Sequence, residues 1–379
     1  MPVRWRTRAL AALAAPLLAA AIVISQGPAG ASAATCENWT GFPAPSPGDS
    51  DGLSGVTAVS RCNVWAVGST LNAAGEQLLA LAEHWNGAAW QVVPTPSPDA
   101  NSNRLEAVAA VSRGSIWAVG ETGSQSFIVR WNGGAWTRVP SPSPGSGVND
   151  LSGVDAVSAT DAWAVGQFSA VTAARPLILR WNGMKWRQVA ANAPRSSVLA
   201  SVTAISARNA WAAGAANGDK ATLIEHWNGR KWARVASPNP GGRVSEIGLD
   251  GVAATSATSA WAVGSYTAGG HQKTLILHWN GRAWKRVPSP SPGSGGSSLL
   301  GVAATSARSA WAVGTYTAGG HHKTVILHWN GRAWKQVPSP NPGTVSELAG
   351  VAAVSARNIW AAGDFSNGGG SQVLLAHCC

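Results

Sequence analysis

The chain has 379 residues, of which 28 are Lys or Arg and 17 are Asp or Glu, so its formal net charge is +11. Glycine, proline and tryptophan are frequent, and helical Lys-Glu-Leu patterning is almost absent. This composition excludes a mainly helical protein and, with 45% apolar residues, a disordered one.

The first 33 residues are predicted to be a secretory signal peptide. Three arginines precede an apolar run over residues 9–24, and Ala31-Ser32-Ala33 provides the small residues of a cleavage site. The run is too short to span a membrane, and no second one follows. Cys36 is not expected to carry a lipid, because Thr35 stands where a lipoprotein signal has a small residue. We therefore expect an exported product without a membrane span, and export argues against nucleic acid as its partner.

Residues 34–379 consist of a repeat that predicts the fold. A Trp-Ala-(Val/Ala)-Gly segment recurs every 46 to 52 residues, with its tryptophan at Trp65, Trp117, Trp163, Trp211, Trp261, Trp311 and Trp360. Short strand-like segments at such a period are typical of a β-propeller, in which each repeat forms one sheet. We predict an all-β fold, a seven-bladed β-propeller of four-stranded antiparallel blades that occupies residues 34–379 as one domain.

The copy at residues 301–343 shows the four expected strands of one blade. Small and β-branched residues suit an innermost strand, and three further strands follow, which places strands at residues 301–306, 310–314, 324–329 and 333–337. Asn330-Gly331 is a strong hairpin signal, and its loop contains either two or four residues. The four-residue loop would pair Trp329 with Trp334 across the hairpin. The Pro-rich run at 338–343 ends the outer strand and leads to the next blade.

Two kinds of position in the hairpin are interpreted as structural because the copies share them. The paired tryptophans are expected to pack between blades, although a tryptophan stripe can also bind sugars. The slot before the first of these tryptophans holds histidine or arginine, namely His84, Arg130, Arg180, His226, His278, His328 and His377. A slot that accepts either residue type is interpreted as a hydrogen-bonding position of the scaffold.

The seventh copy is split between the two ends of the mature chain. The C-terminal segment ends in the third strand of the repeat, and the residues after Cys36 continue with the outer strand. We therefore predict that the N-terminal strand completes the last blade. The cysteines are expected to form two disulfides, with Cys36 bonded to Cys378 or Cys379 and Cys62 bonded to the remaining cysteine. Catalytic or metal-binding cysteines are the alternative interpretation.

The Trp-Asn-Gly-x-x-Trp hairpin, the glycine that closes the second strand and the shared last blade resemble kelch-type repeats and the central propeller of galactose oxidase. More specifically, the His-Trp-Asn-Gly and Pro-Ser-Pro repeats are similar to secreted bacterial propellers of unassigned function. The chain departs from kelch repeats at the end of the second strand, where Val313-Gly314 replaces a Gly-Gly pair. The resemblance implies the fold and export, and it implies no catalytic residue.

Residues that vary between copies are the better candidates for a binding site. Aromatic residues lie two positions beyond the closing glycine in four copies, at Phe168, Tyr266, Tyr316 and Phe365. The histidines outside the shared slot are predicted to lie in the same loops between second and third strands, at His271, His321 and His322. Tyr266 with His271, and Tyr316 with the two adjacent histidines, are predicted to bind a polar ligand such as a glycan. The alternative is a solvated loop tip with a packing aromatic.

Catalytic motifs are not found in the sequence. It contains no nucleophile elbow, phosphate loop or zinc motif, and the adjacent histidines make a poor metal site without a third ligand. The carboxylates are few, and nothing in the spacing of Glu106, Glu121 and Asp155 requires a cluster across the ring axis. We therefore predict no enzyme activity, no cofactor and no metal.

Basic residues gather in the hairpin turn and the outer strand, at Arg230, Lys231, Arg282, Lys285, Arg286, Arg332 and Lys335. They indicate either attraction to anionic wall polymers or protection of the outer edge against pairing with other sheets. We predict a monomeric, non-catalytic binding module for extracellular glycan or cell-wall polymer. A protein-interaction scaffold is the alternative, and a glycan-active hydrolase or lyase comes third.

Overall fold

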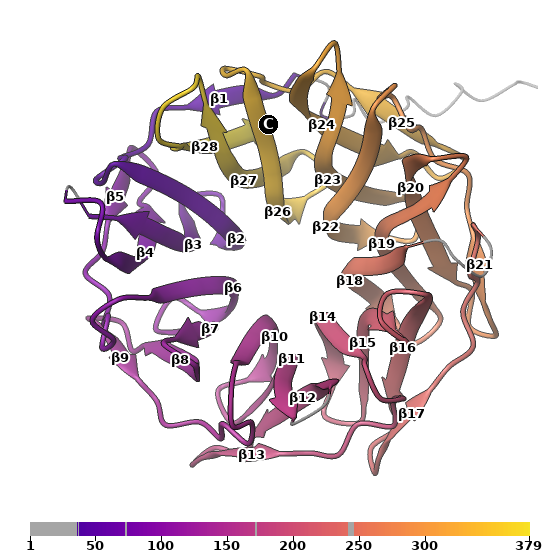
Figure 1. Ribbon diagram of the computed structural model, residues 1–379, viewed down its shortest axis with the longest axis horizontal. Helices are drawn as coiled ribbons and strands as arrows, with labels where there is room; N and C mark the ends of the chain where they lie inside the picture. Colours follow the sequence, from indigo (N-terminus) through magenta and orange to yellow (C-terminus); the bar gives the residue numbers. More distant parts are fainter. Residues whose placement is uncertain (1–35, 37, 73, 171–172, 242–245) are drawn as a thin grey trace, which may run out of the picture. The chain divides into compact units, whose positions relative to one another are not determined.

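The computed structural model describes residues 36, 38–72, 74–170, 173–241 and 246–379. The predicted signal peptide lies outside the described residues. Across these ranges the chain is all-β, with 28 strands and no helix, and hence no helix that could cross a membrane. Within residues 36–379, Figure 1 shows successive groups of strands around a central axis, each running from an inner strand to an outer one.

Four kinds of strand recur in order along the chain. The inner strands are β2 (Ser50–Ser60), β6 (Asn103–Ser112), β10 (Asn149–Ser158), β14 (Val198–Ser206), β18 (Ile247–Ser256), β22 (Gly296–Ser306) and β26 (Val345–Ser355). The second strands are β3 (Asn63–Leu71), β7 (Ser115–Thr122), β11 (Asp161–Ala170), β15 (Asn209–Ala216), β19 (Ser259–Ala268), β23 (Ser309–Ala318) and β27 (Asn358–Ser366). The third strands are β4 (Leu78–Trp85), β8 (Gln125–Trp131), β12 (Ala173–Trp181), β16 (Ala221–Trp227), β20 (His271–Trp279), β24 (His321–Trp329) and β28 (Gln372–Cys378). The outer strands are β5 (Trp90–Val92), β9 (Trp136–Arg138), β13 (Trp186–Gln188), β17 (Trp232–Arg234), β21 (Trp284–Arg286), β25 (Trp334–Val337) and β1 (Thr40–Phe42).

The strands form five four-stranded antiparallel sheets and one mixed sheet of eight strands. The larger sheet joins β22–β25 to β26, β27, β28 and β1 through one parallel pair, His322 with Val345. In this sheet β1 runs antiparallel to β28, with Thr40 opposite His377. The N-terminal strand of the described chain therefore completes the last group of strands, as the split repeat predicts.

The second and third strands are longer than the sequence suggests. Both β19 and β23 continue to a Gly-Gly pair, and each of these four glycines has a positive φ between 60° and 78°. Two such residues form a tight turn that matches the twist of the flanking strands. The expectation that the candidate ligand contacts occupy loops is wrong, because all seven lie within strands: Phe168, Tyr266, His271, Tyr316, His321, His322 and Phe365.

The Trp-Asn-Gly hairpin has the four-residue loop. Trp329 lies directly opposite Trp334, and the Asn330 side chain accepts hydrogen bonds from the backbone N–H groups of Arg332 and Ala333, both at 3.0 Å. Gly331 has a φ of 88°, which a residue with a side chain rarely adopts. The asparagine and glycine are thus explained by the turn itself.

The core lies between neighbouring groups of strands, where tryptophans interlock. The Trp163 ring lies 4.9 Å from Trp227 and 5.0 Å from Trp232, both of the following sheet. Trp360 of β27 makes the corresponding contact with the tryptophan pair of β4 and β5, which closes the ring. Among the described residues, seven hydrophobic clusters each combine side chains from two neighbouring four-strand groups. The paired tryptophans are therefore core residues.

The His or Arg slot supports this packing. The His328 ring stacks on Trp311 at 4.0 Å, and the Arg180 guanidinium lies 4.8 Å from the centre of Trp163. Burial lowers the pKa of His84 and of His226, which favours the neutral imidazole. The slot is structural as predicted, and stacking on tryptophan is its recurring contact.

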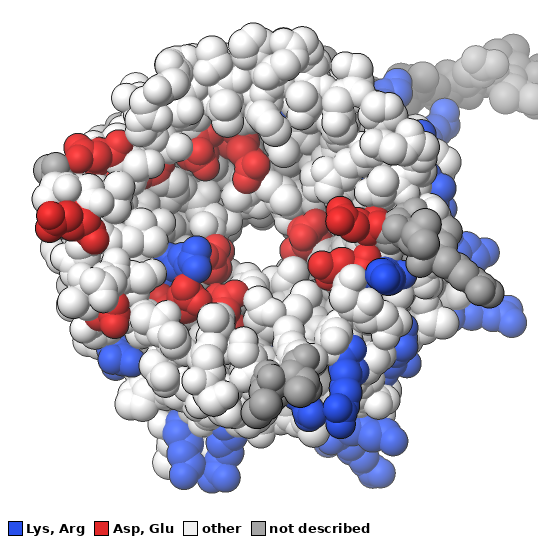
Figure 2. Space-filling model, in the orientation of Figure 1, with Lys and Arg blue, Asp and Glu red and all other residues white. Residues whose placement is uncertain are grey.

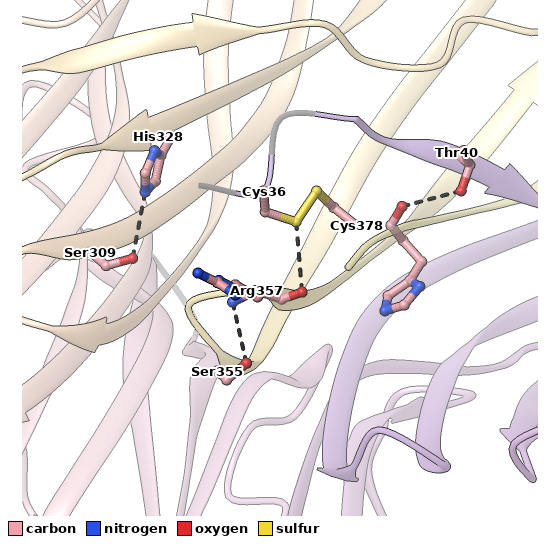
Figure 3. Close-up of a disulfide and its surroundings, with 8 residues drawn as sticks. Cys36, Thr40, Ser309, His328, Ser355, Arg357 and Cys378 are labelled. Atoms are coloured by element: carbon pink, nitrogen blue, oxygen red, sulfur yellow. Dashed lines mark hydrogen bonds between the residues drawn. A yellow bond between two sulfur atoms is a disulfide. The ribbon is translucent and has the colours of Figure 1, made fainter. Parts of the chain in front are cut away.

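A disulfide replaces one tryptophan where the chain ends meet. Cys378 occupies the third-strand tryptophan position, and it is bonded to Cys36 within the cluster that contains Trp39 and Trp311 (Figure 3). The expected second disulfide is not formed: Cys62 and Cys379 are both free cysteines, and both are exposed. Cys62 instead lies against the hairpin of its own sheet, close to Gly87. If Gly87 carried a Cβ atom, that atom would lie 3.0 Å from the Cβ of Cys62.

Removal of the disulfide is expected to destabilise the protein. Cys36 and Cys378 are 342 residues apart, so replacing both with serine frees a very long loop in the unfolded chain and should reduce the free energy of unfolding by roughly 4 kcal/mol. Urea denaturation of the mature chain measures this change. Cys62→Ser is the matched control and should leave the midpoint unchanged. Equal midpoints for the double variant and the wild type would contradict the structural role.

Candidate functional site

Tyr266, one of the predicted ligand contacts, is a core residue. It is only 6% exposed and belongs to the cluster between the β14–β17 and β18–β21 sheets. The Arg286 guanidinium lies 4.8 Å from the ring centre and donates a hydrogen bond to the tyrosine hydroxyl. His271 is exposed at the start of β20, paired with Ala268 rather than with Tyr266. The two residues are therefore not presented together to a ligand.

The corresponding residues of the neighbouring repeat are more accessible. Tyr316 is half-buried in β23 and packs against the cluster between the β18–β21 and β22–β25 groups, while His321 and His322 are exposed at the start of β24. Phe365 is half-buried in β27 and lines a surface pocket near Gly370. Among the described residues, no group of three or more His, Cys, Asp or Glu side chains is placed to hold a metal ion.

A hydroxyl in the third strand fixes the Pro-rich linker that follows most sheets. Thr274 Oγ1 lies 2.8 Å from Ser289 Oγ and donates to the carbonyl oxygen of Pro290 at 2.9 Å. The same contacts, which we call the hydroxyl clamp, join Ser126 to Ser141, Thr222 to Ser237 and Thr324 to Ser339. The Pro-Ser-Pro motif is thus a structural partner of the third strand.

The β10–β13 sheet lacks this clamp. Pro176 stands at the threonine position and Ala191 at the serine position, so neither hydroxyl is present. A pocket of about 200 Å³ opens at this place on the surface. Its lining, which we call the Phe168 pocket, includes Phe168, Arg175, Pro176, Gln188, Ala191 and Arg195.

The equivalent place in the β18–β21 sheet retains the contacts that the β10–β13 sheet lacks. There Tyr266 and Arg286 contact each other where the β10–β13 sheet has Phe168 and Gln188, and Thr274 holds the linker against the strand. Gln188 is exposed and has no such bond to Phe168, because a phenylalanine ring offers no hydroxyl. The Phe168 ring is half-buried and forms part of the pocket wall.

Acidic side chains surround the central channel on the same face. Inner strands line the channel with small residues, and Glu106 and Asp250 are the carboxylates among them. Figure 2 shows Asp and Glu side chains around the channel mouth and Lys and Arg side chains mainly at the periphery. Burial, reinforced by the charge of Asp219, raises the pKa of Asp250 to about 7. Burial, reinforced by Asp150, also raises the pKa of Glu106. We call this region the acidic mouth.

Two further carboxyls lie in the core and are not site residues. Glu83 and Glu225 are fully buried, and neither carboxyl oxygen of Glu83 has a hydrogen-bond partner within the described chain. Burial, with a smaller contribution from Asp51, raises the pKa of Glu83 to about 8. Burial raises the pKa of Glu225 to about 7, against the opposing effect of its hydrogen bond to the Asn192 backbone and the charge of Arg234.

The buried carboxyls predict a stability that falls as the pH rises. The pKa of Glu83 is near 8 in the folded state and near 4.5 in the unfolded state. The folded state therefore keeps its full stability below pH 4.5 and loses stability as the pH rises from 4.5 to 8. Glu83→Leu places at this position the residue found in three other copies, Leu179, Leu277 and Leu327. The difference in free energy of unfolding between this variant and the wild type should be more favourable to the variant at pH 8 than at pH 4.5, by roughly 3–5 kcal/mol. Denaturation across this pH range measures the effect. The exposed Glu76→Gln should preserve the wild-type profile, and a parallel profile for Glu83→Leu would contradict the prediction.

Of the residues that form the Phe168 pocket, sequence reasoning identified only the aromatic ring. Arg175, Gln188 and Arg195 were not among the expected contacts. The signal was present in the linker, where Val-Ala-Ala-Asn-Ala-Pro-Arg replaces the Val-Pro-Ser-Pro-Ser-Pro-Gly of other copies. This change in the linker sequence can be interpreted only when the hydroxyl clamp is known, because the clamp shows that the serines of the usual linker bind the third strand.

No family model matches the sequence, and no curated protein matches it either. Solved structures are similar over most of the chain. They include YCF48 bound to D1 peptide (16% identity, TM-score 0.57, covering 90% of this chain and 95% of that chain) and the GH74 xyloglucanase from Xanthomonas campestris (15%, 0.56, 86% and 53%). An ulvan lyase of family PL25 bound to -[GlcA(1-4)Rha3S]- is also similar (10%, 0.54, 87% and 94%). These proteins are β-propellers, and at such identities the likeness shows that this chain has the β-propeller fold.

Proposed function

We propose that the protein is an exported, seven-bladed, kelch-like β-propeller that binds extracellular glycan through the Phe168 pocket and catalyses no reaction. Counting the eight-stranded sheet as two blades is supported by its single parallel bridge and by the seven inner strands. Export is supported by the predicted signal peptide and by the disulfide, which requires a non-reducing compartment.

The observation that carries the proposal is the pocket beside Phe168. It combines an aromatic ring with a few polar groups, which is the usual composition of a small-ligand site. It lies where the linker departs from the pattern of the repeat, and while Phe168 and Ala191 also pack against the core, the exposed Arg175, Gln188 and Arg195 are outside these core clusters. Two of the similar propellers, the xyloglucanase and the ulvan lyase, act on glycans by their names.

Binding without hydrolysis is favoured by the position of the carboxyls. The lining of the Phe168 pocket contains no Asp or Glu among the described residues, whereas Glu106 and Asp250 lie on the central channel. Glycoside hydrolysis usually requires two carboxyl groups that flank the bond to be cleaved. A sugar held in the pocket would have no such pair.

A protein-binding role is the second candidate, and the acidic mouth favours it. Charged residues around a channel would attract a partner segment of opposite sign. One of the similar propellers, YCF48, is bound to a peptide. In that case a basic peptide, and no glycan, would bind the isolated protein.

Removal of the Phe168 ring is expected to weaken glycan binding by at least tenfold, because the ring forms the pocket wall. Glycan-array screening of the wild type followed by calorimetry with the bound glycans measures the effect of Phe168→Ala. Tyr316→Ala is the matched control, because it truncates the same repeat position in a blade that retains its clamp, and it should bind normally.

Closing the pocket provides an independent check that does not remove an aromatic side chain. Pro176→Thr combined with Ala191→Ser restores the two hydroxyls of the clamp and should hold the linker against β12. This variant is expected to be folded and to have lost glycan binding. Wild-type affinity in both this variant and Phe168→Ala would exclude the pocket as the site.

A further inference from the structure

Resting on the proposed function, we infer that the Phe168 pocket recognises a sugar residue that carries a carboxylate, a hexuronate, through Arg175 and Arg195. The two arginines line the pocket from different segments, one in β12 and one just before β14. Gln188 from the outer strand adds an amide to the same lining. The pocket therefore presents two positive charges and an amide beside an aromatic wall.

The two guanidinium groups are free for a ligand. Both side chains are exposed, and neither forms an ion pair within the described part of the chain. Arginines with structural roles differ in this respect, because Arg180 is held by Asp161 at 2.8 Å and Arg104 by Glu121 at 2.6 Å. Two guanidinium groups that line one pocket without forming ion pairs to carboxylates of the described chain are suited to bind an external carboxylate.

Arg195 stands where the repeat normally excludes a side chain. Most other copies have glycine here, and a Cβ on Gly293 would lie 2.2 Å from the Gly296 carbonyl oxygen. The linker before β14 follows another path, in which Ser196 has a φ of 56°, a value uncommon outside glycine. The altered linker therefore opens the pocket and also provides room for the second arginine.

The size and shape of the pocket restrict the ligand to one small residue. Its volume of about 200 Å³ lies below the ~300–1,000 Å³ of sites that enclose drug-sized ligands. A hexuronate carries its carboxylate directly on the sugar ring. One residue can therefore place an apolar ring face against Phe168 and a charge between the two arginines. A linear alditol phosphate polymer would offer a negative charge to the arginines, but it has no sugar ring to pack against Phe168.

The experiment compares ligands that differ only in charge. Calorimetry of the mature protein would use oligosaccharides of galacturonate, glucuronate and mannuronate, each beside its neutral methyl ester. At least one acid is expected to bind, with its ester at least tenfold weaker. The affinity of the acid should fall as salt is raised from about 0.05 to 0.5 M, because exposed charges are screened.

Variants test whether these arginines provide the recognition. Arg175→Gln and Arg195→Gln should each reduce affinity for the acid at least tenfold and leave the thermal midpoint unchanged. Arg187→Gln, an exposed arginine on the outer strand of the same sheet, is the matched control and should bind normally. Wild-type affinity in the double variant would overturn the inference.

The outcomes separate this inference from the proposed function. Equal affinity for the acids and their esters, abolished by Phe168→Ala, would overturn uronate recognition and retain glycan binding. Binding of neutral glycans and of no acidic glycan would likewise overturn uronate recognition and retain glycan binding. Absence of binding to every glycan, acidic or neutral, would overturn both.

Discussion

The interlocking of tryptophans between neighbouring blades is the contact on which the rest of the structure depends. Six of the seven second-strand tryptophans, such as Trp163, pack against two tryptophans of the next blade. Large aromatic side chains contribute most of the buried apolar area at such contacts. Because the contact also joins the last blade to the first, the ring has no free end in its core. Where the sequence lacks one tryptophan, Cys378 and its disulfide to Cys36 fill the position and join the chain ends.

A repeated core makes departures from the repeat informative. The hydroxyl clamp recurs with the same atoms in several blades, so its loss at Pro176 and Ala191 cannot be attributed to the fold. In the β10–β13 sheet, where both hydroxyls are missing, the linker borders a pocket with an aromatic wall and two arginines that form no ion pair within the described residues. By contrast, Tyr266 departs from the repeat without creating a site, because Arg286 in the outer strand β21 bonds its hydroxyl and covers its ring.

The repeat period was sufficient to predict the strand order, the split last blade and the structural role of the tryptophans and the His or Arg slot. These features depend on local patterns that recur in sequence. The burial of Tyr266 was not predictable in this way, since it depends on a residue 20 positions away in another strand. The acidic mouth depends on residues still further apart in sequence, because Glu106 and Asp250 come from different groups of strands that line the same channel. Alignment of the repeat left Cys378 and Cys379 as the two candidate partners of Cys36, and in the structure the buried Cys378 forms the bond while Cys379 is exposed.

The separation of charge on the binding face restricts the kind of acidic glycan that fits. In the proposed site Arg175 and Arg195 would attract a carboxylate, whereas the mouth that contains Glu106 and Asp250 repels negative charge when its carboxyls are ionised, which for Asp250 requires a pH above about 7. A chain with a carboxylate on every residue would be attracted at one end and repelled wherever it reached the mouth, within about 10 Å at ordinary ionic strength. A glycan with an isolated or terminal uronate avoids that repulsion. The two regions thus act together, since the acidic mouth favours a sparsely charged ligand and the arginines fix the position of its single charge.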